Sequence, residues 1–188
     1  MRCLILLSVI SFFISCSENR ESPVFVDYTK TLDSISAIYS KPQKGEYLVD
    51  IKSIFNKSDW DSIAFILPYQ PLSYIENMNL CNIDFLMDTI KYVVGVEWNY
   101  GLLFVTRGCI TSYSVVGGNP SFSEICGHSG PTVPILKRSN TLVKLVNIPG
   151  ANGEQSFYFM PTNYPSEEEL NDLKNRSESH QPIDSLRP

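Results

Sequence analysis

Hydrophobic positions along the chain follow different spacings, and each spacing predicts a different element. Apolar side chains recur at helical intervals in residues 27–39, which predicts a helix there. Residues 46–55 alternate between apolar and polar side chains, as a strand with one solvated face does. The short apolar run of residues 62–67 predicts a buried strand, which Pro68 ends.

The second half of the chain is typical of strands. Pro71 opens a short helix, which residues 82–90 extend by another turn. Residues 90–98 and 102–116 are rich in β-branched and aromatic residues, with turn formers at 99–101 and at Arg107-Gly108. These segments predict three consecutive strands joined by tight turns. Two further strands are expected at 141–148 and 154–160.

Together these elements predict an α+β fold of mainly antiparallel sheet. We expect a meander of about five or six strands, with a few short helices on one face. The domain would span residues 27–165, and residues 166–188 would form a short acidic helix and a disordered tail. Residues 117–134 have no periodicity, and a loop of that length is often functional.

The first apolar run, Leu4–Ile14, follows a single positive charge at Arg2. A helix of about eleven residues reaches about 16 Å at 1.5 Å per residue. A bilayer core of about 30 Å needs roughly twenty residues. The run therefore fits a secretory signal peptide better than a membrane span.

The end of this run, Phe13-Ile14-Ser15-Cys16, resembles the lipobox of bacterial lipoproteins, although Phe13 stands where leucine is commoner. Ser15 before the cysteine is frequent in Bacteroidota members of that family. The resemblance implies that residues 1–15 are removed as a signal peptide and that Cys16 carries lipid. Residues 16–26 would then be a tether to the membrane of the cell envelope, most simply the outer membrane. The alternative is a plain secretory signal with a coincidental cysteine.

Composition limits the partners of the protein. The net charge is −5, and the chain contains no run of Lys and Arg. Nucleic acids are bound through clustered basic residues, so a nucleic-acid partner is not expected. The membrane would be reached through the lipid anchor.

Three cysteines, Cys81, Cys109 and Cys126, remain in a compartment that permits disulfides. One bridge and one free thiol is the first expectation, and the sequence leaves the pairing open. Three buried free thiols are the alternative. A metal site or other cofactor is not expected, because the chain has two histidines and no Cys-x-x-Cys pair.

Two groups of side chains are candidates for catalysis. Cys126 and His128 lie two residues apart in the long loop, but catalytic partners usually meet in space rather than in sequence. A disulfide from Cys126 to Cys81 or Cys109, which would fix the loop, is favoured there. Asp59 and Asp61 flank Trp60, and alternate residues of an extended segment point the same way. The favoured interpretation is that Trp60 packs while both aspartates face water or cap a turn.

The segment around these aspartates, "FNKSDWDSIAFILPYQP" (residues 55–71), resembles a recurrent pattern in small bacterial proteins. In that pattern a Trp-Asp pair precedes a hydrophobic strand that ends in Pro-Tyr. The resemblance implies a shared fold and no particular activity.

The leading functional prediction is a non-enzymatic, lipid-anchored envelope protein that binds a partner protein or an envelope component. The sheet and the loop 117–134 would form its contact region. One alternative is a hydrolase acting on envelope polymers through Asp59 and Asp61, or through Cys126 and His128. Another is an immunity or inhibitor-like lipoprotein.

Overall fold

A five-stranded sheet lies at the centre of the protein. It is seen in a computed structural model that describes residues 21–39, 47–125, 132–149 and 155–163. In spatial order its strands are β1 (Val24–Phe25), β5 (Cys109–Gly117), β4 (Asn99–Thr106), β3 (Ser62–Ile66) and β6 (Ile135–Lys137). The two-residue strand β1 runs parallel to β5, and the other neighbours are antiparallel.

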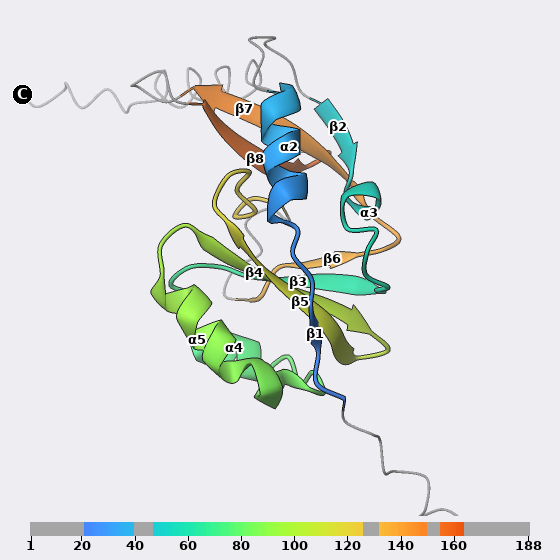
Figure 1. Cartoon of the computed structure of the whole chain (residues 1–188), viewed down its shortest axis with the longest axis vertical. Helices are drawn as coiled ribbons and strands as arrows, with labels where there is room; N and C mark the ends of the chain where they lie inside the picture. The colour runs from blue at the N-terminus through green and yellow to red at the C-terminus, as the bar shows by residue number, and fades with distance from the viewer. Residues whose placement is uncertain (1–20, 40–46, 126–131, 150–154, 164–188) are drawn as a thin grey trace, which may run out of the picture.

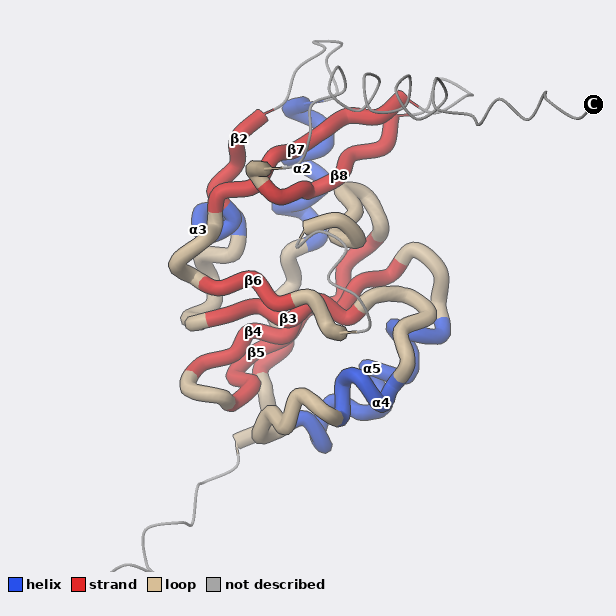
Figure 2. Tube along the Cα trace, turned by 180° about the vertical axis from the view of Figure 1, so that it is seen from behind, coloured by secondary structure: helices blue, strands red, loops and turns tan. Residues whose placement is uncertain are grey.

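A second sheet of three antiparallel strands packs against one face of the first. Its order is β2 (Tyr47–Asp50), β7 (Leu142–Pro149) and β8 (Gln155–Pro161). The helical elements are α2 (Thr29–Tyr39), α3 (Ile51–Ile54), α4 (Leu72–Glu76), the 3₁₀ turn η1 (Ile83–Leu86) and α5 (Met87–Gly95). Helices α4 and α5 cover the other face of the five-stranded sheet, whereas α2 lies against the three-stranded sheet (Figures 1 and 2).

This architecture confirms the predicted α+β class, with sheets that are mostly antiparallel. Two details of the prediction are wrong. The strands divide between two sheets because β7 and β8 pair with β2 and not with the central hairpin. The helices do not share one face, because α2 and α5 pack in different hydrophobic clusters.

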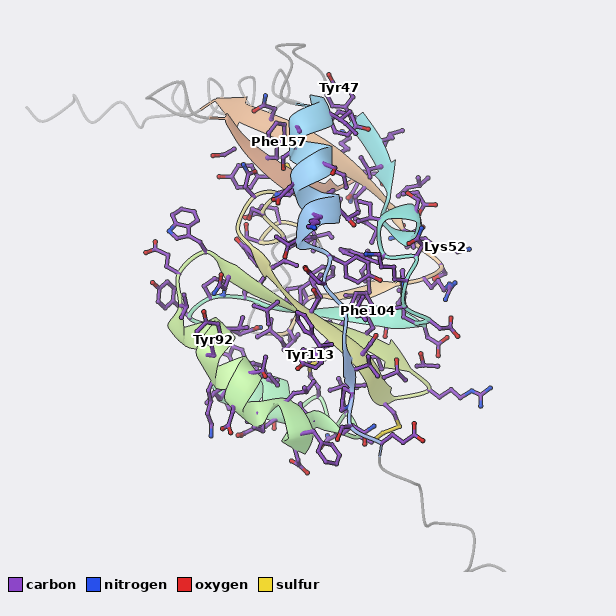
Figure 3. All side chains as sticks on the ribbon, in the orientation of Figure 1. Tyr47, Lys52, Tyr92, Phe104, Tyr113 and Phe157 are labelled. Atoms are coloured by element: carbon purple, nitrogen blue, oxygen red, sulfur yellow. A yellow bond between two sulfur atoms is a disulfide. The ribbon has the colours of Figure 1, made fainter. Side chains whose placement is uncertain are left out.

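The central strand β4 is buried on both faces. Its six inner residues, Tyr100–Val105, are all buried. Leu102 and Phe104 point into the cluster between the sheets, and Leu103 and Val105 point into the cluster under α5. Figure 3 shows Phe104 in the interior and Tyr92 on the outer side of α5. A strand enclosed on both sides reads as a continuous apolar run rather than an alternating one.

Phe122 joins the two sheets. Its ring centroid lies 5.4 Å from that of Phe65 on β3 and 5.1 Å from that of Phe159 on β8. Tyr100 and Phe55 also approach it, at 5.8 and 6.3 Å. The described part of the predicted loop 117–134 is therefore largely a core segment, which corrects the expectation that the whole loop forms a contact surface. Residues 126–131 lie outside the described residues.

The prediction of a first strand at residues 90–98 is wrong for most of that segment, because residues 87–95 form helix α5. Its β-branched valines favour a strand locally. However, Leu86, Ile90 and Val93 fall on one helical face, and all three are buried against the sheet. Burial of that face outweighs the local preference.

The hairpin predicted at residues 99–101 is also wrong, since these residues are already inside β4. Packing at this position is tight: a Cβ atom on residue 101 would lie 3.1 Å from the Cβ of Ile66, so Ile66 would have to move by a few tenths of an ångström. The reversal before β4 occurs at Trp98, whose φ is +71°. The turn predicted at Arg107-Gly108 is confirmed, and both residues have positive φ, as a type I′ hairpin turn needs.

Other predicted elements are confirmed within a few residues. Helix α2 begins after Asp27, whose carboxylate accepts a hydrogen bond from the Thr29 N–H at 2.9 Å. That hydrogen bond holds the pKa of Asp27 below its usual value. Strands β3, β7 and β8 and the helix after Pro71 fall where the patterns place them. The predicted strand at 46–55 stops at Asp50, which accepts from the Lys52 N–H and starts α3.

The last residues of the segment predicted as a tether, 16–26, belong to the folded part of the protein. Val24 and Phe25 pair with Ser112 and Tyr113, so the chain joins the sheet at β1. The predicted signal peptide, Cys16 and the segment 166–188 lie outside the described residues. In the described ranges, no helix has the length and apolar character to cross a membrane.

We expect Phe122→Ala to lower the free energy of unfolding by about 3–5 kcal/mol, because it removes the ring that joins the two sheets. Urea unfolding followed by circular dichroism measures the loss. Phe85→Ala is the matched control, since Phe85 is 51% exposed and its loss should cost less than about 0.5 kcal/mol. Equal losses would contradict a central role for Phe122.

Candidate functional site

Asp59 is held by Arg138, far away in the sequence. The Asp59 Oδ1 accepts a hydrogen bond from the Arg138 Nη1 at 2.7 Å. The same nitrogen donates to the backbone oxygen of Trp60 at 2.8 Å, and the guanidinium lies over the Trp60 ring at 5.4 Å. The Asp59 side chain is 87% exposed, so the ion pair itself contributes little stability. The stabilising part of this contact is the packing of the guanidinium against the buried Trp60 indole.

Asp61 has a different partner. Its Oδ2 accepts the N–H of Arg107 at 2.8 Å and so supports the β4–β5 turn. Its backbone oxygen accepts from the Arg138 N–H, also at 2.8 Å. The two aspartates therefore bind separate groups and do not converge on one point. This geometry favours the structural interpretation of the pair over an acid–base role.

Cys81 and Cys109 form a disulfide, with Cα atoms 4.5 Å apart. Backbone hydrogen bonds from Cys81 N to Gly108 O and from Ile110 N to Cys81 O, both 3.1 Å, flank the bond. The bridge fixes the segment after α4 to the β4–β5 hairpin. The favoured pairing of Cys126 with Cys81 or Cys109 is wrong, because those two sulfurs bond each other. Cys126 and His128 lie outside the described residues.

A groove of about 440 Å³ opens beside β6, at the junction of the two sheets. Its inner wall is apolar, from Ile125, Leu136 and Val143, which are buried. Its described rim is polar and includes Ser139 and Asn140. The full described lining is Ile125, Ile135, Leu136, Lys137, Ser139, Asn140, Leu142, Val143, Pro161, Thr162 and Asn163. An apolar hollow with a few polar groups at its mouth is typical of binding sites.

The outer backbone edge of β6 runs along this groove. Leu136 pairs with Ile63, and the hydrogen bonds from Phe65 N to Pro134 O and from Arg138 N to Asp61 O flank that pair. In an antiparallel ladder the alternate residues, Ile135 and Lys137, then direct their N–H and C=O groups away from β3. The Lys137 oxygen accepts from the Asn140 N–H at 2.9 Å. No described residue pairs with the other three groups.

Two other edges are covered. The segment around Ser121 runs beside β8, with Ser121 N donating to Phe157 O at 2.7 Å and Phe159 N donating to Ser121 O at 2.9 Å. Strand β1 covers part of the β5 edge, where Val26 N donates to Tyr113 O at 2.8 Å. Among the described residues, the outer edge of β6 has no strand partner, and the outer edge of β2 has none either. The edge of β6 differs in bordering the groove.

A second hollow of about 300 Å³ lies between β1 and the Asp59 segment. Lys57, Asp59 and Thr111 contribute polar groups to it. The described ranges contain no group of His, Cys, Asp and Glu side chains that could hold a metal ion.

No family model, curated protein or solved structure matches the chain.

Sequence reasoning missed β6 and its groove. The segment Pro134-Ile135-Leu136-Lys137 is short, but it is bounded by a proline and by Ser139-Asn140, which form turns. Proline beside a short apolar run is typical of an edge strand. That signal was present, whereas nothing in the sequence places Ile125 or Val143 opposite it.

We expect the double variant Cys81→Ser, Cys109→Ser to lose about 3–4 kcal/mol of unfolding free energy, the chain-entropy value for a separation of 28 residues. Chemical unfolding under non-reducing conditions measures this. Cys126→Ser is the control, because it keeps the Cys81–Cys109 bridge and should therefore lose less than the double variant. Peptide mapping without reduction that found Cys126 bridged to either residue would refute the pairing.

Proposed function

We propose that this protein is a lipid-anchored, non-enzymatic binding module of the bacterial cell envelope. The observation that carries the proposal is the groove beside the open edge of β6, at the opposite edge of the central sheet from β1. The lipobox-like end of the first apolar run supports the anchor. The partner would be a protein or a component of the envelope.

The anchor would hold the β1 side of the molecule close to the lipid. Glu21, where the described chain begins, is five residue steps after Cys16. Even fully extended, these steps span at most about 18 Å. Strand β1 follows three residues later, so this sheet edge would remain near the membrane surface (Figure 1).

The groove would then lie on the side that is free to meet a partner. The order β1-β5-β4-β3-β6 puts four strand spacings between the two edges. At 4.7–4.9 Å each, they add to about 19 Å. An anchored edge and a distant open edge let the protein hold the membrane and bind a partner at the same time.

The contacts of Asp59 and Asp61 support binding over hydrolysis as the primary role. Hydrolysis by a carboxylate pair requires both groups to flank one reacting bond. Asp59 is engaged by Arg138 and Asp61 by the Arg107 N–H. The groove beside β6, in contrast, combines an apolar inner wall with backbone groups that no described residue pairs.

We expect radiolabelled palmitate to enter the full chain in a bacterial host that modifies lipoproteins, and not to enter a Cys16→Ala variant. The sulfur of Cys16 is the attachment atom, so its removal abolishes labelling. Cys3→Ala is the matched control and should label normally. Equal labelling of the Cys16→Ala variant would refute the anchor.

We expect a photo-reactive phenylalanine analogue placed at Ile135 to give a defined cross-link in intact cells. The same analogue at Lys91, on the exposed side of α5, should not give that product. Ser139→Trp, which fills the groove from its rim, should remove the Ile135 product. Identical products from both positions, or a product unaffected by Ser139→Trp, would contradict binding in the groove.

A further inference from the structure

We propose that the outer edge of β6 receives an extended acidic segment of a partner protein as an added antiparallel strand. This inference rests on the proposed binding function and names the class of partner. Three backbone groups carry it: the N–H and C=O of Ile135 and the N–H of Lys137. Only an extended peptide presents acceptors and donors at the matching interval.

The ladder fixes how the incoming strand would lie. One of its residues exchanges two hydrogen bonds with Ile135, as residues of a hydrogen-bonded antiparallel pair do. The carbonyl two positions earlier in the peptide accepts from the Lys137 N–H. The Lys137 oxygen is already used by Asn140, so the added pairing ends there.

Side chains of the added strand would fall on two faces, because directly opposite residues of a sheet point the same way. The residue opposite Leu136 points toward the space between the sheets, where Ile125 and Val143 form the apolar wall. A leucine-sized side chain fits a groove of about 440 Å³. The residue opposite Ile135, which is 48% exposed, covers an apolar side chain.

The charge of Lys137 determines which residue is preferred at the third position of the added strand, the one opposite Lys137. Lys137 is the only charged side chain in the described lining of the groove. The peptide residue directly opposite it is therefore best acidic, since opposite charges across a strand pair attract. Read from its amino end, the preferred sequence is an acidic residue, a large aliphatic residue and a β-branched residue.

A lysine on a short edge strand has another common use, which is to prevent pairing with other chains. The two roles differ in what a change of charge does. A charged residue that only prevents pairing works equally well whether it is positive or negative. A residue that recognises a peptide prefers a peptide of the opposite charge. The half-exposed Ile135 beside Lys137 also favours recognition, because an apolar residue weakens the protection against pairing.

The test uses two fluorescein-labelled peptides, Thr-Thr-Glu-Leu-Val-Thr-Thr and its counterpart with Lys in place of Glu. Fluorescence anisotropy measures their binding to the full chain in mild detergent. We expect the Glu peptide to bind the wild type about two- to fivefold more tightly than the Lys peptide, the range for one exposed ion pair. Lys137→Glu, an exposed substitution, should reverse the preference.

A backbone test complements the charge swap. Ile135→Pro removes the outward N–H without touching the ladder to β3 and should abolish binding. Ile135→Thr, which keeps the N–H and the β-branch, should retain most of it. Hydrogen exchange of the Ile135 and Lys137 amides should slow when the Glu peptide binds. The amide of Leu48, which points outward on β2, should not change.

Absence of binding, or equal binding of both peptides to both proteins, would overturn the proposal. Protection of the Ile135 and Lys137 amides that is lost on removing residues 164–188 would assign the edge to the chain's own end instead. If the peptides fail while the Ile135 cross-link persists, the groove binds something other than a strand, and the proposed function stands. Loss of both results would remove the binding function itself.

Discussion

The enclosure of the central sheet on both faces is the constraint on which the rest of the structure depends. Strand β4 has no solvated face, so each of its inner side chains needs a partner in a covering layer. Helices α4 and α5 supply one layer, and the three-stranded sheet with α2 supplies the other. Phe122 meets side chains of both sheets, which makes the segment before β6 part of the core. The position of β6, and the groove beside it, follow from that packing.

Elements with a single buried face were predicted correctly from the sequence. Predictions failed for elements whose conformation depends on packing against another layer of the structure. Helix α2 and strands β7 and β8 each present one apolar face, and their periodicity shows it. The start of α5 lies in the predicted helical turn at 82–90, but residues 90–95 were predicted as a strand, because their β-branched valines favour one locally and the buried helical face is defined by the sheet beneath it. Gly101 was predicted to lie in a turn, but it lies inside β4, where Ile66 leaves little room for a side chain.

The candidate site was less predictable than the fold because its parts are distant in sequence. Asp59 and Asp61 were predicted as a pair from their spacing. Their partners lie far away in the sequence: Arg138 is 79 residues from Asp59, and Arg107 is 46 residues from Asp61. Nothing in the local pattern joins them. The disulfide is similar: three pairings were open, and only the hairpin position of Cys109 beside Cys81 decides among them. Topology, not composition, selects these contacts.

The two edges of the central sheet are treated differently, and the difference has a physical basis. An edge strand exposes unpaired backbone groups, which proteins usually cover or shorten. At one edge the chain's own entry segment, β1, covers part of β5. At the other, β6 ends after three residues, and its outward groups border an apolar hollow. An uncovered edge on a flat surface gains little from an added strand, because hydrogen bonds to a peptide largely replace those to water. The hollow changes this balance, since an added strand would also bury an apolar side chain there, and burial provides the net gain that backbone pairing alone does not.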